Sequence, residues 1–129
     1  MIRLATQDDV DFIAELELSV FPDHGVNEYA VKQVIEAGMV TVFSQVGYII
    51  THWGSEIADI LRVGVHPDHR GRGIGHLLLD EVLSKAWLPV MLTVQQSNVR
   101  AIRLYSGLGF HPIAFMPQDT AIIMRKERS

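Results

Sequence analysis

The sequence predicts a mixed α/β fold built around one sheet. Runs rich in β-branched residues alternate with runs whose apolar residues recur at helical spacing. One strand–loop–helix–strand sequence in the second half is typical of a right-handed crossover. At 129 residues with 48% hydrophobic and 20% charged residues, the chain is long enough for one core. We therefore expect a single domain, residues 1–129, with the element order β-α-α-β-β-β-α-β-α-β-β.

The first third of the chain predicts a short strand and two helices. Residues 2–5 are β-rich, and a helix should follow because valine, isoleucine and leucine recur every three or four positions. Asp8 or Asp9 would cap this helix, and the next phenylalanine–proline pair would end it. Asn27 would cap the second helix, which Gly38 would end.

The middle of the chain predicts consecutive strands. Residues 39–54 form two β-rich runs around a tight Ser44–Gln45 turn, and residues 56–65 form a third strand. A helix is expected over 73–86. The run 88–94 carries no charge and is rich in β-branched residues, so it should be a buried strand.

The C-terminal part predicts a helix followed by a strand pair. Asn98 is a natural N-cap, and Gly109 a natural stop for the helix that begins after it. Residues 110–115 and 120–126 are β-rich, and the sequence "MPQD" between them would make their connection.

Composition excludes several classes of protein. There is no cysteine, which removes a disulfide framework, a thiolate metal site and a cysteine nucleophile. The histidines lack the i, i+4 spacing with a third ligand that a metal site needs, so we expect no metal. A net charge of −4 disfavours binding to nucleic acid. The acidic N-terminus is unlike a signal peptide, and no apolar run approaches the ~20 residues of a membrane span, so we expect a cytoplasmic protein.

The stretch "RGRGIG" between a predicted strand and a predicted helix is typical of an anion-binding loop. Gly71, Gly73 and Gly75 permit positive φ and close approach of a ligand to the backbone. The first amides of a helix lack intrahelical partners and carry partial positive charge, and Arg70 and Arg72 add to it. The alternative is a solvated turn with two surface arginines. A pyrophosphate is the ligand that this arrangement favours.

Two nucleotide-binding patterns do not match this loop. It lacks the Gly-Lys-Ser/Thr ending of a Walker A loop, and His76 stands where a dinucleotide fingerprint needs its third glycine. The pattern Arg/Gln-x-x-Gly-x-Gly/Ala after a strand does match, and so does "NVRAIRLYSGLGF" downstream. Together these segments resemble the GNAT superfamily of N-acetyltransferases. "LTVQQSN" and "AIIM" are similar to the bacterial ribosomal-protein N-terminal acetyltransferases.

The resemblance implies the GNAT fold, with strands 4 and 5 splayed apart, and acetyl-CoA as co-substrate. It places the pyrophosphate on the loop amides and the pantetheine arm along the main chain of strand 4. Asn98 would lie near that arm, although a plain N-cap explains it equally well. The implied cofactor-binding residues are Val63, Val65, Arg70, Gly71, Arg72, Gly73, Ile74, Gly75 and Asn98.

The resemblance also implies a general acid. Tyr105 occupies the place of the family's tyrosine that protonates the departing CoA thiolate. Its apolar neighbours in the helix leave the alternative of a core aromatic residue. No cysteine is present for an acetyl-enzyme, so transfer should be direct within a ternary complex, with a strand-4 amide near Val63 stabilising the oxyanion.

A general base must deprotonate the ammonium of the acceptor before attack. Asp59 lies where the histone-acetylating branch carries a glutamate, and being shorter it would act through water. Glu56, His52 and His66 are further candidates. The ribosomal-protein branch carries a glutamate on strand 5, where this chain has Thr93, and a tyrosine pair absent from "AFMPQD". A protein N-terminus as acceptor is therefore less well supported.

The function expected from these residues is N-acetyl transfer from acetyl-CoA to a primary amine, in a small molecule or a protein. A non-catalytic acyl-CoA sensor of the same fold is the alternative, and a toxin acting on aminoacyl-tRNA is disfavoured by the acidic charge. Residues 21–27 and "MPQD" would select the acceptor, which the sequence does not identify. Exposed strand edges leave a homodimer open.

Overall fold

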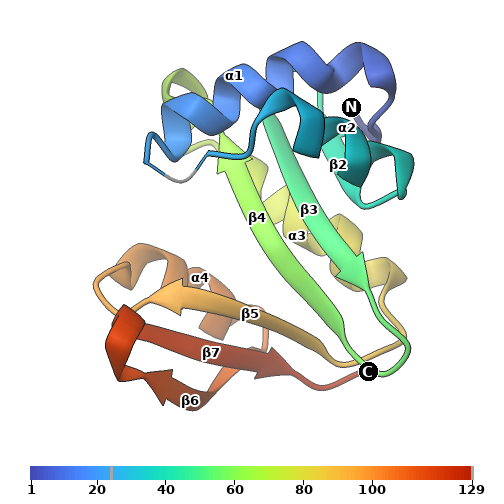
Figure 1. The fold of residues 1–129 in the computed structure, drawn as a ribbon. Helices are drawn as coiled ribbons and strands as arrows, with labels where there is room; N and C mark the ends of the chain where they lie inside the picture. The colour runs from blue at the N-terminus through green and yellow to red at the C-terminus, as the bar shows by residue number, and fades with distance from the viewer. Residues whose placement is uncertain (24, 129) are drawn as a thin grey trace. The chain divides into compact units, whose positions relative to one another are not determined.

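The chain contains the predicted elements in the predicted order (Figure 1). The structure is a computed structural model that describes residues 1–23 and 25–128. The strands are β1 Ile2–Leu4, β2 Val40–Phe43, β3 Gly47–Trp53, β4 Ala58–Val65, β5 Val90–Gln95, β6 His111–Met116 and β7 Ala121–Lys126. The α-helices are α1 Val10–Val20, α2 Glu28–Glu36, α3 Ile74–Lys85 and α4 Val99–Gly107, and the 3-10 helices are η1 Gln7–Asp9, η2 Pro67–His69 and η3 Pro117–Asp119.

The chain divides into two compact units. The first contains Met1–Thr51 and Arg62–Val82, and the second contains His52–Leu61 and the chain from Leu83 onward. Strand β4 contributes its beginning to the second unit and its end to the first. The expectation of one domain over residues 1–129 stays a prediction. No helix among the described residues is long and apolar enough to cross a bilayer.

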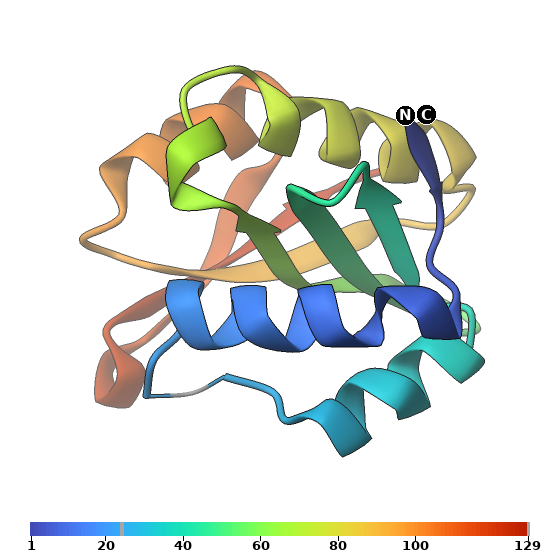
Figure 2. The same cartoon turned by 90° about the horizontal axis from the view of Figure 1, so that it is seen from above.

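The first unit is a sheet covered on both faces. Strands β1, β2 and β3 pair antiparallel, and the end of β4 lies beyond β3. Helices α1 and α2 cover one face and α3 the other (Figure 2). A Cβ added to Gly47 would lie 2.9 Å from Ile74 of α3, so position 47 points toward α3. Because side chains alternate along a strand, Tyr48 points to the opposite face, toward α1.

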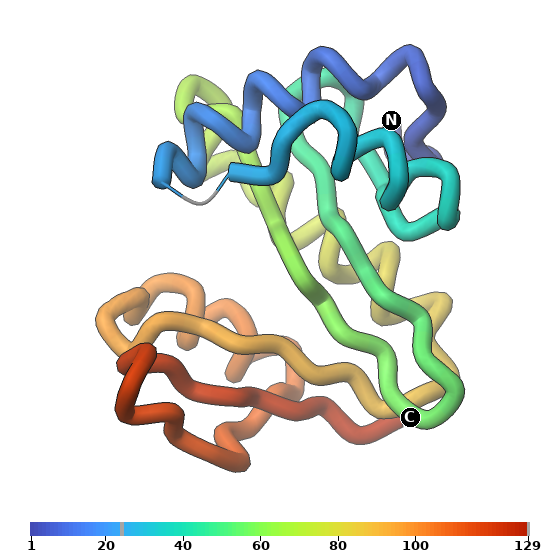
Figure 3. Tube along the Cα trace, in the orientation of Figure 1, coloured from blue at the N-terminus to red at the C-terminus, as the bar shows by residue number. Residues whose placement is uncertain are grey.

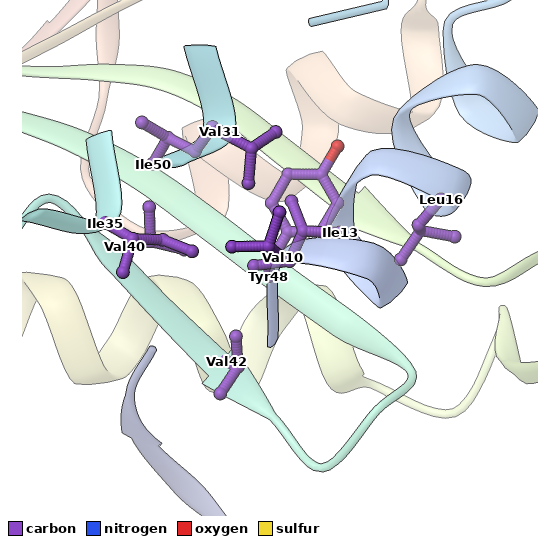
Figure 4. Close-up of a cluster of buried hydrophobic side chains, with 9 residues drawn as sticks. All are labelled: Val10, Ile13, Leu16, Val31, Ile35, Val40, Val42, Tyr48 and Ile50. Atoms are coloured by element: carbon purple, nitrogen blue, oxygen red, sulfur yellow. The ribbon is translucent and has the colours of Figure 1, made fainter. Parts of the chain in front are cut away.

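A cluster of buried apolar side chains joins α1 and α2 to this sheet (Figure 4). The positions on α1 recur at the spacing that the sequence pattern predicted, so that prediction is confirmed. The cluster consists of Val10, Ile13, Leu16, Val31, Ile35, Val40, Val42, Tyr48 and Ile50.

Gly64 on β4 makes room for the largest member of that cluster. A Cβ added to Gly64 would lie 2.5 Å from Cε1 and 2.6 Å from Cζ of Tyr48. The tyrosine ring therefore lies directly over this glycine. The space that this glycine leaves beside β4 is taken by an aromatic ring of the chain itself.

The predicted cap of α1 is arranged differently from the expectation. Asp9 occupies the N-cap position of α1, as predicted, but its buried side chain, 1% exposed, makes no cap hydrogen bond. Its carboxylate accepts two hydrogen bonds from the guanidinium of Arg3, at 2.8 and 2.9 Å, and one from the amide of Thr6 at 2.8 Å. These bonds to Arg3 hold the pKa of Asp9 below its usual value. Asp9 thereby ties β1 to the start of α1.

The second unit contains a sheet of β5, β7 and β6 with the beginning of β4. Strands β5 and β7 are antiparallel, as are β6 and β7, which η3 connects (Figure 3). Strand β4 starts at Ala58, because the amide of Gly54 donates to the carbonyl of Ile57 at 3.0 Å and closes a turn where the sequence predicted strand. Ala58–Ile60 pairs parallel with Val90–Leu92. The splay expected beyond these pairs stays a prediction.

Replacing Gly64 by alanine should destabilise the fold. The new methyl group would overlap the Tyr48 ring, and overpacking of this kind costs about 1–3 kcal/mol. Urea unfolding measures the change. Gly107→Ala is the matched control, because a Cβ there meets nothing within 4 Å and lies in a helix, where alanine is favoured. Equal midpoints for the two variants would contradict this packing.

Candidate functional site

The glycine–arginine loop joins the end of β4 to the start of α3, as predicted. Gly71 and Gly73 adopt φ values of +78° and +79°, in the region that favours glycine. A Cβ added to either would meet nothing within 4 Å. The backbone conformation therefore requires glycine here, whereas packing within the chain does not. The space next to both glycines is open to a ligand.

Positive charge surrounds this loop. The first amides of α3, from Ile74 onward, lack intrahelical acceptors and point toward the loop. Arg70 and Arg72 are exposed beside them. Nε of Arg70 donates to the carbonyl oxygen of Val65 at 3.2 Å, which fixes the arginine against the end of β4. The carbonyl of Val65 therefore already accepts one hydrogen bond. This carbonyl is one of the main-chain groups expected to contact pantetheine.

The end of β4 packs against the first turn of α3. A Cβ built on Gly75 would lie 3.9 Å from Cγ2 of Val65 and 4.0 Å from Cγ1 of Val63. Both valines are half-buried on this face. The structure therefore brings together Val63, Val65 and the loop from Arg70 to Gly75, all within the first unit.

A pocket of about 210 Å³ opens in the second unit and contains the candidate base Asp59. Asp59 is paired in register with Met91, and Thr93 with Ile123, so these side chains lie on neighbouring strands. The wall offers one carboxylate and one hydroxyl among apolar groups. The lining residues are Asp59, Ile60, Leu61, Met91, Leu92, Thr93 and Ile123.

Tyr105 lies on α4, where it is half-buried. Its ring meets that of Phe110 edge to face, with centroids 5.9 Å apart and planes at 62°. Burial raises the pKa of the Tyr105 phenol, so the hydroxyl keeps its proton throughout the neutral range. The ring packing agrees with the role of a core aromatic residue, and the retained proton agrees with the role of a general acid.

Asn98 caps α4, the simpler of its two predicted roles. Its Oδ1 accepts a hydrogen bond from the amide of Ala101 at 3.2 Å.

Among the alternative bases, His66 uses Nδ1 to accept a hydrogen bond from the amide of Asp68 at 3.1 Å. His52 and Glu56 are exposed at the turn between β3 and β4. His52 and Glu56 belong to the second unit, as do Asp59, Asn98 and Tyr105. His66 belongs to the first unit.

Sequence reasoning missed a buried polar cluster in the first unit. Glu17 of α1 is 0% exposed and contacts Tyr48 and Arg62. One signal was available, because Glu17 lies four positions after Ile13, on the helix face that carries the apolar repeat. A buried carboxylate on that face requires hydrogen-bonding or charged partners. No local sequence pattern identifies Tyr48 or Arg62 as the partners of Glu17.

Comparison with known proteins matches this arrangement to one family. The profile of the acetyltransferase (GNAT) family matches residues 36–110, which include β4, the glycine–arginine loop and α4. The chain is similar to the L-amino acid N-acyltransferase MnaT of Escherichia coli, at 30% identity over 81% of the chain and 63% of the relative. It is also similar to the [ribosomal protein bS18]-alanine N-acetyltransferase of Salmonella typhimurium, at 35% identity over 50% of the chain and 46% of that enzyme.

A solved structure has the same fold over almost the whole chain. The Salmonella typhimurium protein yncA, determined with its cofactor acetyl-CoA, superposes with a TM-score of 0.84 at 24% identity, covering 98% of this chain and 92% of that one. The chain spans less than two-thirds of the length of either curated relative. The predicted fold and the predicted resemblance are confirmed, and the chain belongs to the GNAT family of acetyltransferases.

Proposed function

We propose that this chain transfers an acetyl group from acetyl-CoA to a primary amine. The observation that carries the proposal is the loop from Arg70 to Gly75, in which two glycines with positive φ, two arginines and a helix N-terminus converge within a matched family segment. An amine acceptor is supported by the names of two relatives, an L-amino acid N-acyltransferase and a [ribosomal protein bS18]-alanine N-acetyltransferase.

The loop fits the pyrophosphate of CoA. Open space beside Gly71 and Gly73 admits a ligand to the backbone, and the amides of α3 supply donors for phosphate oxygens. Arg70 and Arg72 would neutralise the phosphates. Val63 would offer its main chain to the pantetheine arm. When bound, acetyl-CoA supplies the acetyl group as an activated thioester.

Asp59 would act as the general base. Its carboxylate lines a pocket with an otherwise largely apolar wall, where a primary amine would fit beside Thr93. Through a water molecule, Asp59 would take a proton from the ammonium, so that the nitrogen lone pair can attack the acetyl carbon. The new bond joins nitrogen to that carbon.

Tyr105 would act as the general acid. As the carbon–sulfur bond breaks, the sulfur leaves with the electron pair and the phenol of Tyr105 gives it a proton. Burial keeps the phenol protonated until then. The nitrogen, now bonded to the acetyl carbon, would lose its second proton to the Tyr105 phenolate through solvent, which restores the phenol. The products are the amide and free CoA, and Asp59 releases the proton it took to water. The cytoplasmic location and the homodimer considered in the sequence analysis stay predictions.

The proposal is tested by binding and turnover measured together. Calorimetry with acetyl-CoA should show binding, and a panel of amino acids, polyamines, aminoglycosides and peptides should show thiol release with at least one acceptor. Binding without release for any amine would favour the alternative, a sensor that holds acyl-CoA. Absence of acetyl-CoA binding would contradict both.

Replacing Gly73 by alanine should weaken acetyl-CoA binding by about tenfold or more. The substitution places a side chain in the left-handed region, at about 1–2 kcal/mol, and a methyl group where the ligand would lie. Gly38→Ala is the control, because Gly38 has φ +72° and equally open surroundings at the end of α2. It should lose similar stability while its acetyl-CoA affinity stays unchanged. Equal loss of affinity in both would argue against a loop contact.

Tyr105→Phe should lower kcat by about 10²-fold at pH 7, because general acid catalysis contributes at least that much. The ring and its contact with Phe110 remain, so stability should hold. The defect should shrink above about pH 8.5, where a thiolate leaves without needing a proton. Tyr29→Phe, at an exposed tyrosine of α2, is the control. Unchanged kcat at neutral pH would remove Tyr105 from the mechanism.

Asp59→Asn should lower kcat/KM by about 10²-fold at pH 7. Activity should recover as the pH rises toward about 10, since a free primary amine then no longer needs a base. A pH series of initial rates measures this. Glu56→Gln and His52→Asn test the alternative bases and should retain the wild-type profile. A pH-dependent loss in either one instead would reassign the base.

A further inference from the structure

A row of side chains crosses the sheet of the second unit beside the proposed acceptor pocket. Asp59 of β4 is in register with Met91 of β5, and Met91 is in register with Arg125 of β7. His111 of β6 is in register with Arg125 on its other side. Residues in register on neighbouring strands point to the same face of a sheet. The candidate base and a guanidinium therefore lie in one row, with a single strand between them.

Arg125 borders the acceptor pocket. Asp59 and Ile123 line that pocket, so both point to its face of the sheet. Ile123 lies two positions before Arg125 on β7, and side chains two positions apart in a strand share a face. The next residue, Lys126, points the other way, toward the end of α4, because a Cβ added to Gly109 would lie 3.4 Å from its Cε.

Glu127 orients the guanidinium of Arg125. Nε of Arg125 donates to Oε2 of Glu127 at 2.6 Å, and Nη2 donates to Oε1 at 3.2 Å. Nη1 takes no part in this pair. A guanidinium carries five N–H donors in a planar fork, so it can bind a second carboxylate beside the first.

The spacing of the row sets the length of ligand that can join its two charges. Neighbouring strands are about 4.8 Å apart, so Asp59 and Arg125 are about 10 Å apart across the sheet. Side chains stand roughly perpendicular to a sheet, so the carboxylate and the guanidinium are separated by a similar distance. An ammonium that meets Asp59 through the water of the proposed mechanism lies about 4.5 Å from the carboxylate. A carboxylate bound by Arg125 lies about 2.8 Å from the guanidinium.

The remaining length matches an α-amino acid. About 3 Å is left between the ammonium and the carboxylate of the ligand, which is the distance from nitrogen to carboxylate oxygen that bond lengths give within one amino acid. A peptide would add about 3.5 Å for every further residue, and a polyamine has no carboxylate for Arg125 to bind. Leu61, Met91 and Ile123 make much of the remaining wall apolar, which suits an uncharged apolar side chain.

We propose that Arg125 binds the carboxylate of the acceptor, and that the acceptor is a free α-amino acid with an apolar side chain. This inference rests on the proposed function, in which Asp59 receives the ammonium. It adds the class of acceptor and a residue that determines specificity. Arg125 takes no part in the proton transfers, so it affects only acceptors that carry a carboxylate.

The test uses three amines with the same side chain, L-leucine, L-leucinamide and 3-methylbutylamine, of which only L-leucine has a carboxylate. In Arg125→Gln, kcat/KM for L-leucine should fall about 100-fold, because a charged, forked contact is lost. The values for the other two amines should change less than about 2-fold. Comparison of variant with wild type for each amine removes the differences in their intrinsic reactivity. Arg125→Lys keeps the charge without the fork and should lose about 10-fold for L-leucine alone.

Lys126→Gln is the matched control. It removes one positive charge at the neighbouring position of β7, on the opposite face of the sheet. It should leave kcat/KM for all three amines within about 2-fold of wild type. Both glutamine variants should unfold thermally close to wild type, since exposed ion pairs contribute little to stability. Arg125→Lys remains informative if Arg125→Gln folds poorly.

The outcomes separate this inference from the proposed function. A loss confined to L-leucine in Arg125→Gln, with no loss in Lys126→Gln, supports the inference. If wild type acetylates 3-methylbutylamine, polyamines or peptides as well as L-leucine, or if Arg125→Gln affects the three amines equally, the inference is overturned and the proposed function stands. If wild type acetylates no amine, the proposed function fails, and the assignment of Arg125 fails with it.

Discussion

The placement of the Tyr48 ring over Gly64 organises the first unit. A side chain at position 64 would occupy the space of the ring, so β3 and β4 lie in this relation only with glycine there. The ring then reaches the core of α1 and α2, and its hydroxyl meets the one carboxylate on the buried face of α1. Burial and the bond to Glu17 raise the pKa of Tyr48 strongly, so it stays a neutral donor. One aromatic residue thereby serves both the apolar core and the polar cluster.

Glycine has two different functions along β4 and the loop that follows it. Gly64 is required by packing, whereas Gly71 and Gly73 are required by backbone conformation, with open space around them. Only the second kind points to a ligand. The distinction matters for the site, because among these three glycines only Gly71 and Gly73 leave open space for the predicted cofactor.

Most of the fold could be predicted from local pattern. Apolar periodicity indicated α1, and Asn27 and Asn98 were correctly identified as caps, because a cap bonds to residues within one helical turn. The start of β4 was predicted two residues too early, and Asp9 holds the predicted N-cap position of α1 but bonds to Arg3 and Thr6. Both are decided by contacts made elsewhere, a turn closed by Gly54 and a guanidinium from β1, which a local pattern does not contain.

The sequence alone determined the element order, the glycine–arginine loop and its family, because these depend on spacing between near neighbours in the chain. The tertiary structure alone decided which side chains meet. It grouped Asp59 with Thr93 and Ile123 in one pocket, and it joined Glu17, Tyr48 and Arg62, which are up to 45 positions apart in the chain. Strand pairing and helix packing set such distances, and neither periodicity nor composition carries that information.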